Sequence, residues 1–313
     1  MYVTERLERA TSPLFSYEII PPRRGKSASE ILNIVEQILP YEPPFLDVTS
    51  HPASAIYDEL PDGTIRRRVR RKRTGTISIC GIIQNRYNID TVPHLLCRGF
   101  TKEETEDAMI ELGYLGIHNV MALRGDETNY KKPISASRSV NEHAADLVRQ
   151  LAELKEGRYL EEIENSDPIN MCIGVGGYPE KHWESPNLKR DVQFLKKKVE
   201  AGADYIVTQM FFDNDSFFRF EQACRDAGIT VPIIPGLKII NTLRHLTSLS
   251  RNFHVTLPEA LDDEIRENRG HAREIGIRWA GGQVRELLER GVKCIHFYIL
   301  EDASDVIEVI KGL

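Results

Sequence analysis

Short apolar segments alternate with longer amphipathic segments from one end of the chain to the other. Eight of the short segments are rich in β-branched or aromatic residues and have the length of buried strands. They cover residues 14–19, 45–49, 92–97, 118–123, 170–175, 204–210, 231–236 and 294–299. Because each gap between them can hold a helix, the pattern predicts eight successive strand–helix units.

The clearest helices are predicted at residues 101–116, 140–157, 187–202 and 273–291. Thr101 followed by Glu104 has the spacing of a capping box, and a glycine closes each of several of these segments. Residues 75–87 fit neither the helical nor the strand period. We predict a helix there only because the segment lies between the second and third strands.

Near-continuous apolar strands need helices on their outer faces, and eight such units without a break in composition are typical of a closed parallel barrel. We therefore predict one α/β domain, a (β/α)8 TIM barrel, over residues 1–313. An open doubly wound sheet is the alternative. No internal repeat, low-complexity tract or Gly/Ser-rich linker divides the chain.

Composition and charge narrow the function. The chain has 41 Lys and Arg against 47 Asp and Glu, a net charge of −6, which argues against a nucleic-acid partner. Charged residues occupy the N-terminus where a signal peptide needs an apolar stretch, and no apolar run reaches the length of about 20 residues that spans a membrane. We therefore predict a cytoplasmic protein without a membrane partner.

Five cysteines are spread through apolar runs without a CxxC pair, which predicts buried thiols and neither disulfides nor a metal site. One segment, the basic run at residues 65–73, departs from the acidic character of the chain. We interpret it as a solvated loop or helix. A nucleic-acid-binding module is the less favoured alternative.

In a parallel barrel the active site lies at the carboxyl ends of the strands. Each of the first six predicted strands has polar residues within it or just after it; these are Glu18, Thr49, His94, Arg124-Gly125-Asp126, Tyr178 and Gln209. Any one of them has an ordinary structural explanation, but their joint placement predicts a site. Ile19, Ile20 and two prolines follow Glu18, and desolvation by this segment would raise its pKa toward that of a general acid.

Two further segments bear on cofactor binding. The glycine cluster at residues 174–180 lacks the GxGxxG spacing of a dinucleotide fingerprint, so we interpret it as a backbone turn. Lys196, Lys197 and Lys198 follow on the next helix. One of them could reach a phosphate from the barrel rim, although such runs are usually solvated.

Eight blocks of sequence resemble methylenetetrahydrofolate reductases, in that family's order and over nearly the whole chain. They are SYEIIPPR (16–23), DVTSHP (47–52), VPHLLCRGFT (92–101), GIHNVMALRGDE (116–127), GGYPEKH (176–182), LKKKVEAGADYIVTQMFFD (195–213), IIPGL (233–237) and HFYIL (296–300). The resemblance implies a (β/α)8 barrel with non-covalent FAD that reduces 5,10-methylenetetrahydrofolate to 5-methyltetrahydrofolate. It also implies NADH or NADPH as donor, a link to methionine synthesis and a homo-oligomer.

The resemblance assigns roles to individual residues. Glu18 occupies the place of the family's general acid, which protonates the folate N10. Asp126 occupies the place of a carboxylate that lies beside the flavin and the pterin. Gln209 occupies the place of an amide that contacts the folate or the nicotinamide. His245 occupies a further folate-contacting position. The implied FAD contacts are Thr49, His94, Arg124, Gly125, Asp126, Ala144, Tyr178, His182, Asp191, Lys197 and Lys198.

Several positions depart from the family pattern. Glu301-Asp302 replaces an Asn-Arg pair whose Arg helps to bind folate, and Lys238-Ile239 replaces a proline turn. His143, Phe194 and His245 replace Tyr, Asn and Gln. These changes leave open an alternative, a barrel flavoprotein of the same family reduced by a partner subunit or another carrier. Since the chain ends at Leu313, the resemblance implies no regulatory domain and no inhibition by S-adenosylmethionine.

Overall fold

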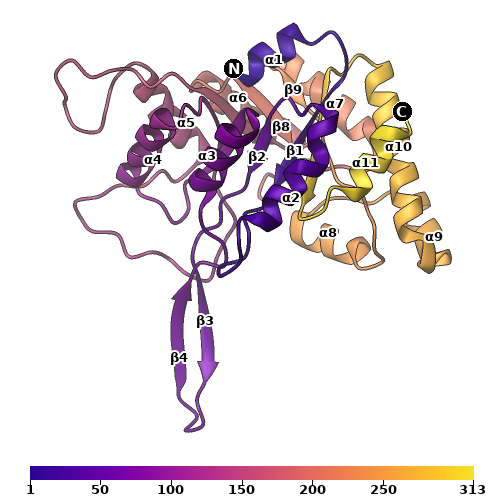
Figure 1. Ribbon diagram of the computed structural model, residues 1–313, viewed down its shortest axis with the longest axis horizontal. Coiled ribbons are helices and arrows are strands. Elements are labelled where there is room, and N and C mark those ends of the chain that lie inside the picture. Colours follow the sequence, from indigo (N-terminus) through magenta and orange to yellow (C-terminus); the bar gives the residue numbers. More distant parts are fainter.

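The parallel strands follow one another around the sheet in chain order. The computed structural model describes residues 1–313 (Figure 1). The strands of the main sheet are β1 (Leu14–Ile19), β2 (Leu46–Val48), β5 (Thr91–Leu96), β6 (Asn119–Leu123), β7 (Cys172–Gly177), β8 (Tyr205–Thr208), β9 (Ile233–Ile234), β10 (Gly236–Leu237) and β11 (Cys294–Leu300).

The sheet closes on itself. β11 pairs with β1 on one side and with β10 on the other, while β9 pairs with β8. β9 and β10 are two halves of one strand interrupted by Pro235, which has no N–H for the ladder but accepts a hydrogen bond from His296 N at 2.9 Å. The nine short strands therefore fill eight positions, and the predicted (β/α)8 barrel is confirmed.

Helices surround this barrel. They are α1 (Val3–Arg9), α2 (Ser29–Ile38), α3 (Thr76–Tyr87), α4 (Lys102–Tyr114), α5 (Ala144–Lys155), α6 (Leu188–Glu200), α7 (Asn214–Asp226), α8 (His245–Phe253), α9 (Glu259–Glu267), α10 (Ala272–Glu289) and α11 (Ser304–Lys311). The four clearest predicted helices and the helix at 75–87 are confirmed within a few residues at each end. None of the helices combines the length and apolar character needed to cross a bilayer.

The two faces of each strand have different roles. Side chains such as Tyr17, Val120 and Phe297 point outward into the main core beneath the helices. Phe45 and Tyr205 belong to a second cluster in which α1 packs against residues from many strands. The apolar interior therefore lies toward the amino ends of the strands, and all five cysteines are buried and unpaired, as predicted.

The basic run adopts neither of the predicted forms. Residues Ile65–Arg70 form strand β4, which pairs antiparallel with β3 (Ser54–Glu59) in a hairpin that projects from the barrel (Figure 1). The prediction of a loop or helix was wrong because an Asp62-Gly63 turn joins two extended segments, and this dipeptide favours hairpins. The expectation of solvation holds, since every residue of β4 is exposed.

Three helices, α8 to α10, separate the broken strand from β11 and share their own apolar cluster. Gly276 of α10 packs directly on the loop between β10 and α8. A Cβ at this position would lie 1.7 Å from the carbonyl oxygen of Ile240. Only glycine permits this close approach of helix and loop.

Candidate active site

Glu18 lies at the carboxyl end of β1, inside the mouth of the barrel. Strand alternation directs its side chain inward while those of Tyr17 and Ile19 join the outer core. The pairing register with β11 shifts between Glu18 and Ile19, so a β-bulge adjoins this residue. Bulges of this kind commonly re-aim side chains beside active sites. The side chain is only 13% exposed.

A histidine connects Glu18 to a second carboxylate. His94 Nε2 lies 3.6 Å from a Glu18 carboxylate oxygen and 3.3 Å from Asp47 Oδ2. Asp47 is 1% exposed, and its other oxygen has no hydrogen-bond partner. Three neighbouring strands thus bring two carboxyl groups and one imidazole together in a space almost closed to water.

This environment changes the proton affinity of both groups. Burial raises the pKa of Glu18 to about 7, although the charge of His94 opposes the rise. Burial lowers the pKa of His94, but the hydrogen bond to Asp47 and the charge of Glu18 outweigh it and raise the pKa above its usual value. Glu18 can therefore hold a proton near neutral pH and release it beside a cationic imidazole.

Asp126 and Gln209 stand at the same end of the barrel. Gly125, with φ +85°, turns the chain after β6 in the left-handed region that favours glycine. Burial raises the pKa of Tyr178 to about 12 and the charge of Asp126 adds to the rise; Asp126 has the same effect on Glu18. Gln209 follows β8 directly, and its side-chain oxygen accepts a hydrogen bond from the N–H of the next residue at 2.9 Å.

Three basic side chains gather at the rim next to this mouth. Lys198 Nζ donates to the Gly176 carbonyl at 2.6 Å, and burial lowers its pKa to about 8. Arg124 pairs with Glu184 at 2.6 Å. Burial lowers the pKa of His182, and the charges of Arg124 and Lys198 act in the same direction. Such a cluster is suited to bind an anion.

Asp191, which was expected to contact a cofactor, holds the loop between β7 and α6. Its two carboxylate oxygens accept hydrogen bonds from His182 N at 3.1 Å and Ser185 Oγ at 2.7 Å. The ring of Tyr178 meets that of His182 edge to face at 4.7 Å. Asp191 therefore positions the loop that carries the ring of His182.

The remaining predicted residues are more dispersed. Thr49 follows β2, and its hydroxyl is buried without a partner. Ala144 and His245 begin α5 and α8. Lys197 is exposed, with its ammonium 5.7 Å from the ring centroid of Phe194. Lys197 is therefore more open to solvent than Lys198.

Sequence reasoning missed two members of the site. Asp47 was detectable, because a carboxylate in the middle of an apolar strand needs a buried partner. Lys238, noted only as a departure from a family pattern, donates to the Tyr298 carbonyl at 2.7 Å, and its charge lowers the pKa of Glu18 against the effect of burial. Its proximity to Glu18 follows only from closure of the barrel, which places β10 and β1 on either side of β11.

The departures at residues 301 and 302 have partners in the structure. Glu301 pairs with Arg73, which also donates to the Pro21 carbonyl at 2.5 Å. Asp302 accepts a hydrogen bond from Ser304 N at 2.9 Å at the start of α11. The first carboxylate therefore ties the base of the hairpin to the loop after β11.

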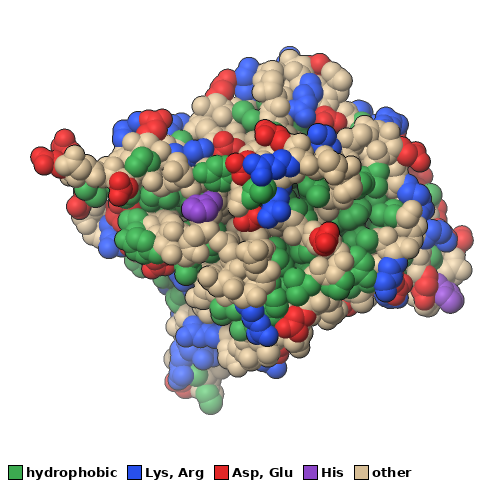
Figure 2. All heavy atoms as spheres, turned by 45° about the horizontal axis from the view of Figure 1, so that its top comes forward, with side chains coloured by type: hydrophobic (Ala, Val, Ile, Leu, Met, Phe, Trp, Pro, Cys, Tyr) green, Lys and Arg blue, Asp and Glu red, His purple; other side chains and the backbone are tan.

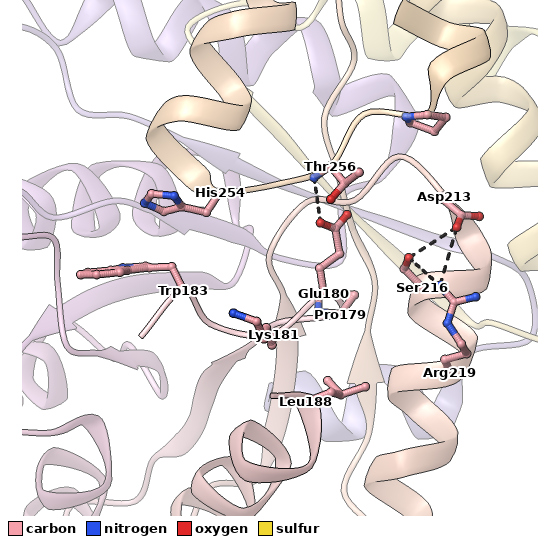
Figure 3. A pocket seen from close by; sticks show the side chains of 11 residues that line it. Pro179, Glu180, Lys181, Trp183, Leu188, Asp213, Ser216, Arg219, His254 and Thr256 are labelled. Carbon is pink, nitrogen blue, oxygen red and sulfur yellow. Dashed lines mark hydrogen bonds and ion pairs between the residues drawn. The ribbon is translucent and has the colours of Figure 1, made fainter. Parts of the chain in front are cut away.

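A cavity of about 760 Å³ lies outside the β7–α6 loop, between α7 and the α8–α9 connection (Figure 3). Glu180 points across it and accepts a hydrogen bond from Thr256 N at 2.7 Å. The rings of Trp183 and His254 lie 5.5 Å apart at its edge. None of the residues around Glu18 lines this cavity, so it is separate from the mouth.

Comparison with known proteins gives consistent results. A family model described as methylenetetrahydrofolate reductase matches residues 3–313. The chain is 30% identical over 307 residues to 5,10-methylenetetrahydrofolate reductase of Buchnera aphidicola subsp. Baizongia pistaciae, covering 95% of this chain and 90% of that protein. It is 28% identical to methylenetetrahydrofolate reductase (NADH) 1 of Zea mays, covering 96% of this chain but 48% of that protein. The chain thus spans about half the length of the plant relative.

A solved structure shares the fold. It is an uncharacterized protein from Clostridium thermocellum, described as binding two copies of 5-methyl-5,6,7,8-tetrahydrofolic acid. The TM-score is 0.55 at 13% identity, and the match covers 98% of this chain and 96% of that chain. At this identity the likeness concerns the fold alone.

Proposed function

The chain belongs to the methylenetetrahydrofolate reductase family, and from this premise we propose that it reduces 5,10-methylenetetrahydrofolate to 5-methyltetrahydrofolate. A nicotinamide, NADH or NADPH, would be the electron donor, and the product would serve methionine synthesis. The observation that carries the proposal is Glu18, a nearly buried carboxyl group with a pKa of about 7 at the mouth of the barrel.

The residues at the rim fit FAD as the cofactor. Arg124 and Lys198 have the charge, and His182 has the hydrogen-bonding ring nitrogens, to hold a pyrophosphate. The buried hydroxyl of Thr49, which has no partner within the chain, offers a hydrogen bond to a polar atom of the cofactor. Bound FAD would supply a hydride carrier between the nicotinamide and the folate.

Glu18 would act as the general acid. Its proton passes to N10 of the folate, the bond from N10 to the bridging carbon breaks, and a cationic iminium remains on the folate. Asp126 lies at the same mouth, where its negative charge stabilises that cation. A hydride delivered to the iminium carbon then completes the methyl group, and Gln209 would orient the folate through its amide.

His94 and Asp47 would support the proton transfer. Once Glu18 is a carboxylate, the imidazolium of His94 at 3.6 Å stabilises its negative charge. Asp47, hydrogen-bonded to the same nitrogen, favours the charged form of the ring. Both are positioning residues, since they act on Glu18 rather than on the folate.

The test separates the two halves of the reaction. Purified protein should be yellow, NADH or NADPH should bleach its flavin under anaerobic conditions, and methylenetetrahydrofolate should restore the colour. In Glu18→Gln, bleaching should continue at a similar rate while recovery by folate falls by at least about a hundredfold, because only that half needs the acid.

Each departure from this result has a definite meaning. Equal loss of both halves in Glu18→Gln would refute its role as the acid. The protein could also be yellow and stay yellow with both NADH and NADPH. If methylenetetrahydrofolate still reoxidised the flavin after chemical reduction, the folate reaction would stand and the electron donor would be another carrier. A protein that cannot bind FAD would refute the proposal as a whole.

A further inference from the structure

The cavity beside the loop between β7 and α6 contains none of the residues assigned to the proposed reaction (Figure 3). Its volume of about 760 Å³ lies within the range of about 300–1,000 Å³ that is typical of small-molecule sites. Most of the side chains that line it are polar or charged, and they come from the loop, from α7 and from the connection between α8 and α9. The cavity therefore suits a ligand that carries several polar groups.

One edge of the cavity is aromatic. Trp183 is 53% exposed, and its ring centroid lies 5.5 Å from that of His254, with the two planes inclined by 34°. Figure 3 shows both rings on the same side of the cavity. An exposed indole face binds planar rings by stacking, and every nucleotide base has a face that can stack in this way. The pair of rings therefore offers a surface for a base.

Lys181 brings a positive charge to the cavity. Its backbone has φ +85°, in the left-handed region that is costly for a residue other than glycine. The N–H of the next residue, His182, donates to Asp191 at 3.1 Å, and this bond holds the turn in place. The side chain of Lys181 is half-buried, and its ammonium has no hydrogen bond or ion pair within the chain. An unpaired ammonium in a cavity is suited to bind a phosphate.

A second cation lies on α7. The guanidinium of Arg219 is 3.8 Å from Asp213 and donates to Ser216 Oγ at 3.1 Å. Its side chain is 66% exposed, and an ion pair of this length and exposure contributes little stability. The guanidinium is therefore available to a ligand. Figure 3 shows Lys181 between Trp183 and Arg219.

Carboxylates narrow the class of ligand. Glu180 accepts a hydrogen bond from Thr256 N at 2.7 Å through one oxygen, and its other oxygen has no partner in the chain. Together with Asp213, it would repel a ligand that is negatively charged throughout. The hydroxyl groups of a ribose, however, donate hydrogen bonds to carboxylates, as they do in dinucleotide-binding sites. A nucleotide offers both kinds of group, hydroxyls for Glu180 and phosphates for the two cations.

The surrounding surface adds no general attraction for anions. Figure 2 shows acidic and basic side chains interspersed over the body of the molecule, whereas Lys and Arg are concentrated on the projection at the lower edge. The chain as a whole has a net charge of −6. Recognition of a phosphate must therefore come from Lys181 and Arg219 themselves, at short range within the cavity.

We propose that this cavity binds a nucleoside 5′-diphosphate. The base stacks on Trp183 and His254, the ribose hydroxyls donate to Glu180, and the phosphates lie between Lys181 and Arg219. Figure 3 shows Trp183, Glu180 and Arg219 in this order across the cavity. The ligand is either a free nucleotide or the ADP half of a nicotinamide dinucleotide whose other end reaches the mouth. Only the second source rests on the proposed function.

Isothermal titration calorimetry tests the site on the full chain saturated with FAD, so that the flavin site is filled. ADP should bind to one site per chain at submillimolar concentration. Adenosine lacks the phosphates and pyrophosphate lacks the base, so each should bind at least about tenfold more weakly than ADP. Equal affinity of pyrophosphate and ADP would overturn the proposal, as would no binding of ADP at millimolar concentration.

Substitutions locate the site. Trp183→Ala and Lys181→Met should each weaken the binding of ADP by about tenfold or more. Lys311→Met, at an exposed position of α11 without an ion pair, is the matched control and should bind ADP as the wild type does. None of the three side chains is buried, so the variants should fold, and circular dichroism checks this. Equal affinity of the wild type and both cavity variants for ADP would also overturn the proposal.

Anaerobic reduction of the flavin by the nicotinamide donor distinguishes the two sources. If the ligand is the dinucleotide, ADP competes with the donor, and Trp183→Ala raises the donor concentration required for the half-maximal rate about tenfold. If the ligand is a free nucleotide, neither ADP nor the substitution changes this concentration. Both results keep the site. ADP that competes equally well in the wild type and in Trp183→Ala acts at the mouth, and this result would overturn the assignment to the cavity. The calorimetric test does not require the donor to reduce the flavin, so failure of the site and failure of the proposed reaction are distinguishable.

Discussion

Removing the charge of Glu18 should stabilise the fold while it disables the proposed reaction. Burial raises the pKa of this carboxyl from about 4.5 to about 7, so the folded protein resists ionisation that the unfolded chain permits. A group whose pKa is raised on folding contributes to the stability of the fold. This contribution is fully present at pH values below the pKa of the unfolded chain, and it is lost as the pH rises through the pKa of the folded protein. Above about pH 7, the wild type therefore carries a buried charge that Glu18→Gln lacks.

The size of the effect follows from the shift. A difference of about 2.5 units between the folded and unfolded pKa corresponds to about 3 kcal/mol at high pH. Most of the loss falls between pH 5 and pH 8, where it amounts to about 2.5 kcal/mol. Relaxation of the protein around the buried carboxylate lowers the cost of its charge, so we expect about 1–2 kcal/mol.

Urea unfolding at both pH values measures the difference directly. Glu18→Gln should exceed the wild type in free energy of unfolding at pH 8, and the advantage should fall to about a quarter of that value at pH 5. Glu289→Gln, at an exposed position of α10 without an ion pair, serves as control and should show no such dependence. A variant that is less stable than the wild type at pH 8, or equally displaced at both pH values, would refute the assignment of a desolvated Glu18.

Three other predictions concern the reaction, the rim and the fold. Anaerobic stopped flow measures how fast folate reoxidises the reduced flavin. This rate should fall about tenfold per pH unit above about pH 7, because Glu18 loses its proton there. A rate that stays constant up to pH 9 would contradict this prediction. Lys198→Met should weaken FAD binding about tenfold or more in a fluorescence titration. Lys196 is the control, because its ammonium lies 3.9 Å from Glu200, and Lys196→Met should leave FAD binding unchanged. Equal effects of the two substitutions would count against the anion site. Gly276→Ala should cost about 3 kcal/mol or more in urea unfolding, because its methyl group would meet a carbonyl oxygen at 1.7 Å. Gly282→Ala, on the same helix with nothing within 4 Å, should gain up to about 1 kcal/mol, and similar values for both would be inconsistent with the packing described.

Local pattern was sufficient for most of the fold. Parallel strands covered on both faces must be apolar along their length, so the segments at 14–19, 92–97 and 294–299 were recognisable without any tertiary information. The pattern of apolar and polar residues was insufficient to identify a strand that is exposed to solvent. β4 has arginines in successive positions, and only the Asp62-Gly63 turn distinguishes it from a helix or loop.

The sequence by itself determined which residues could lie at the mouth, because strand ends and the alternation of side chains are local properties of the chain. Only the tertiary structure decided which of them interact. Glu18, Asp47 and His94 are separated by tens of residues, and their contacts depend on the register of three adjacent strands and on the register shift between β1 and β11 at Glu18. The pKa of Glu18 follows from that arrangement, since desolvation and neighbouring charge arise only when the barrel closes around it.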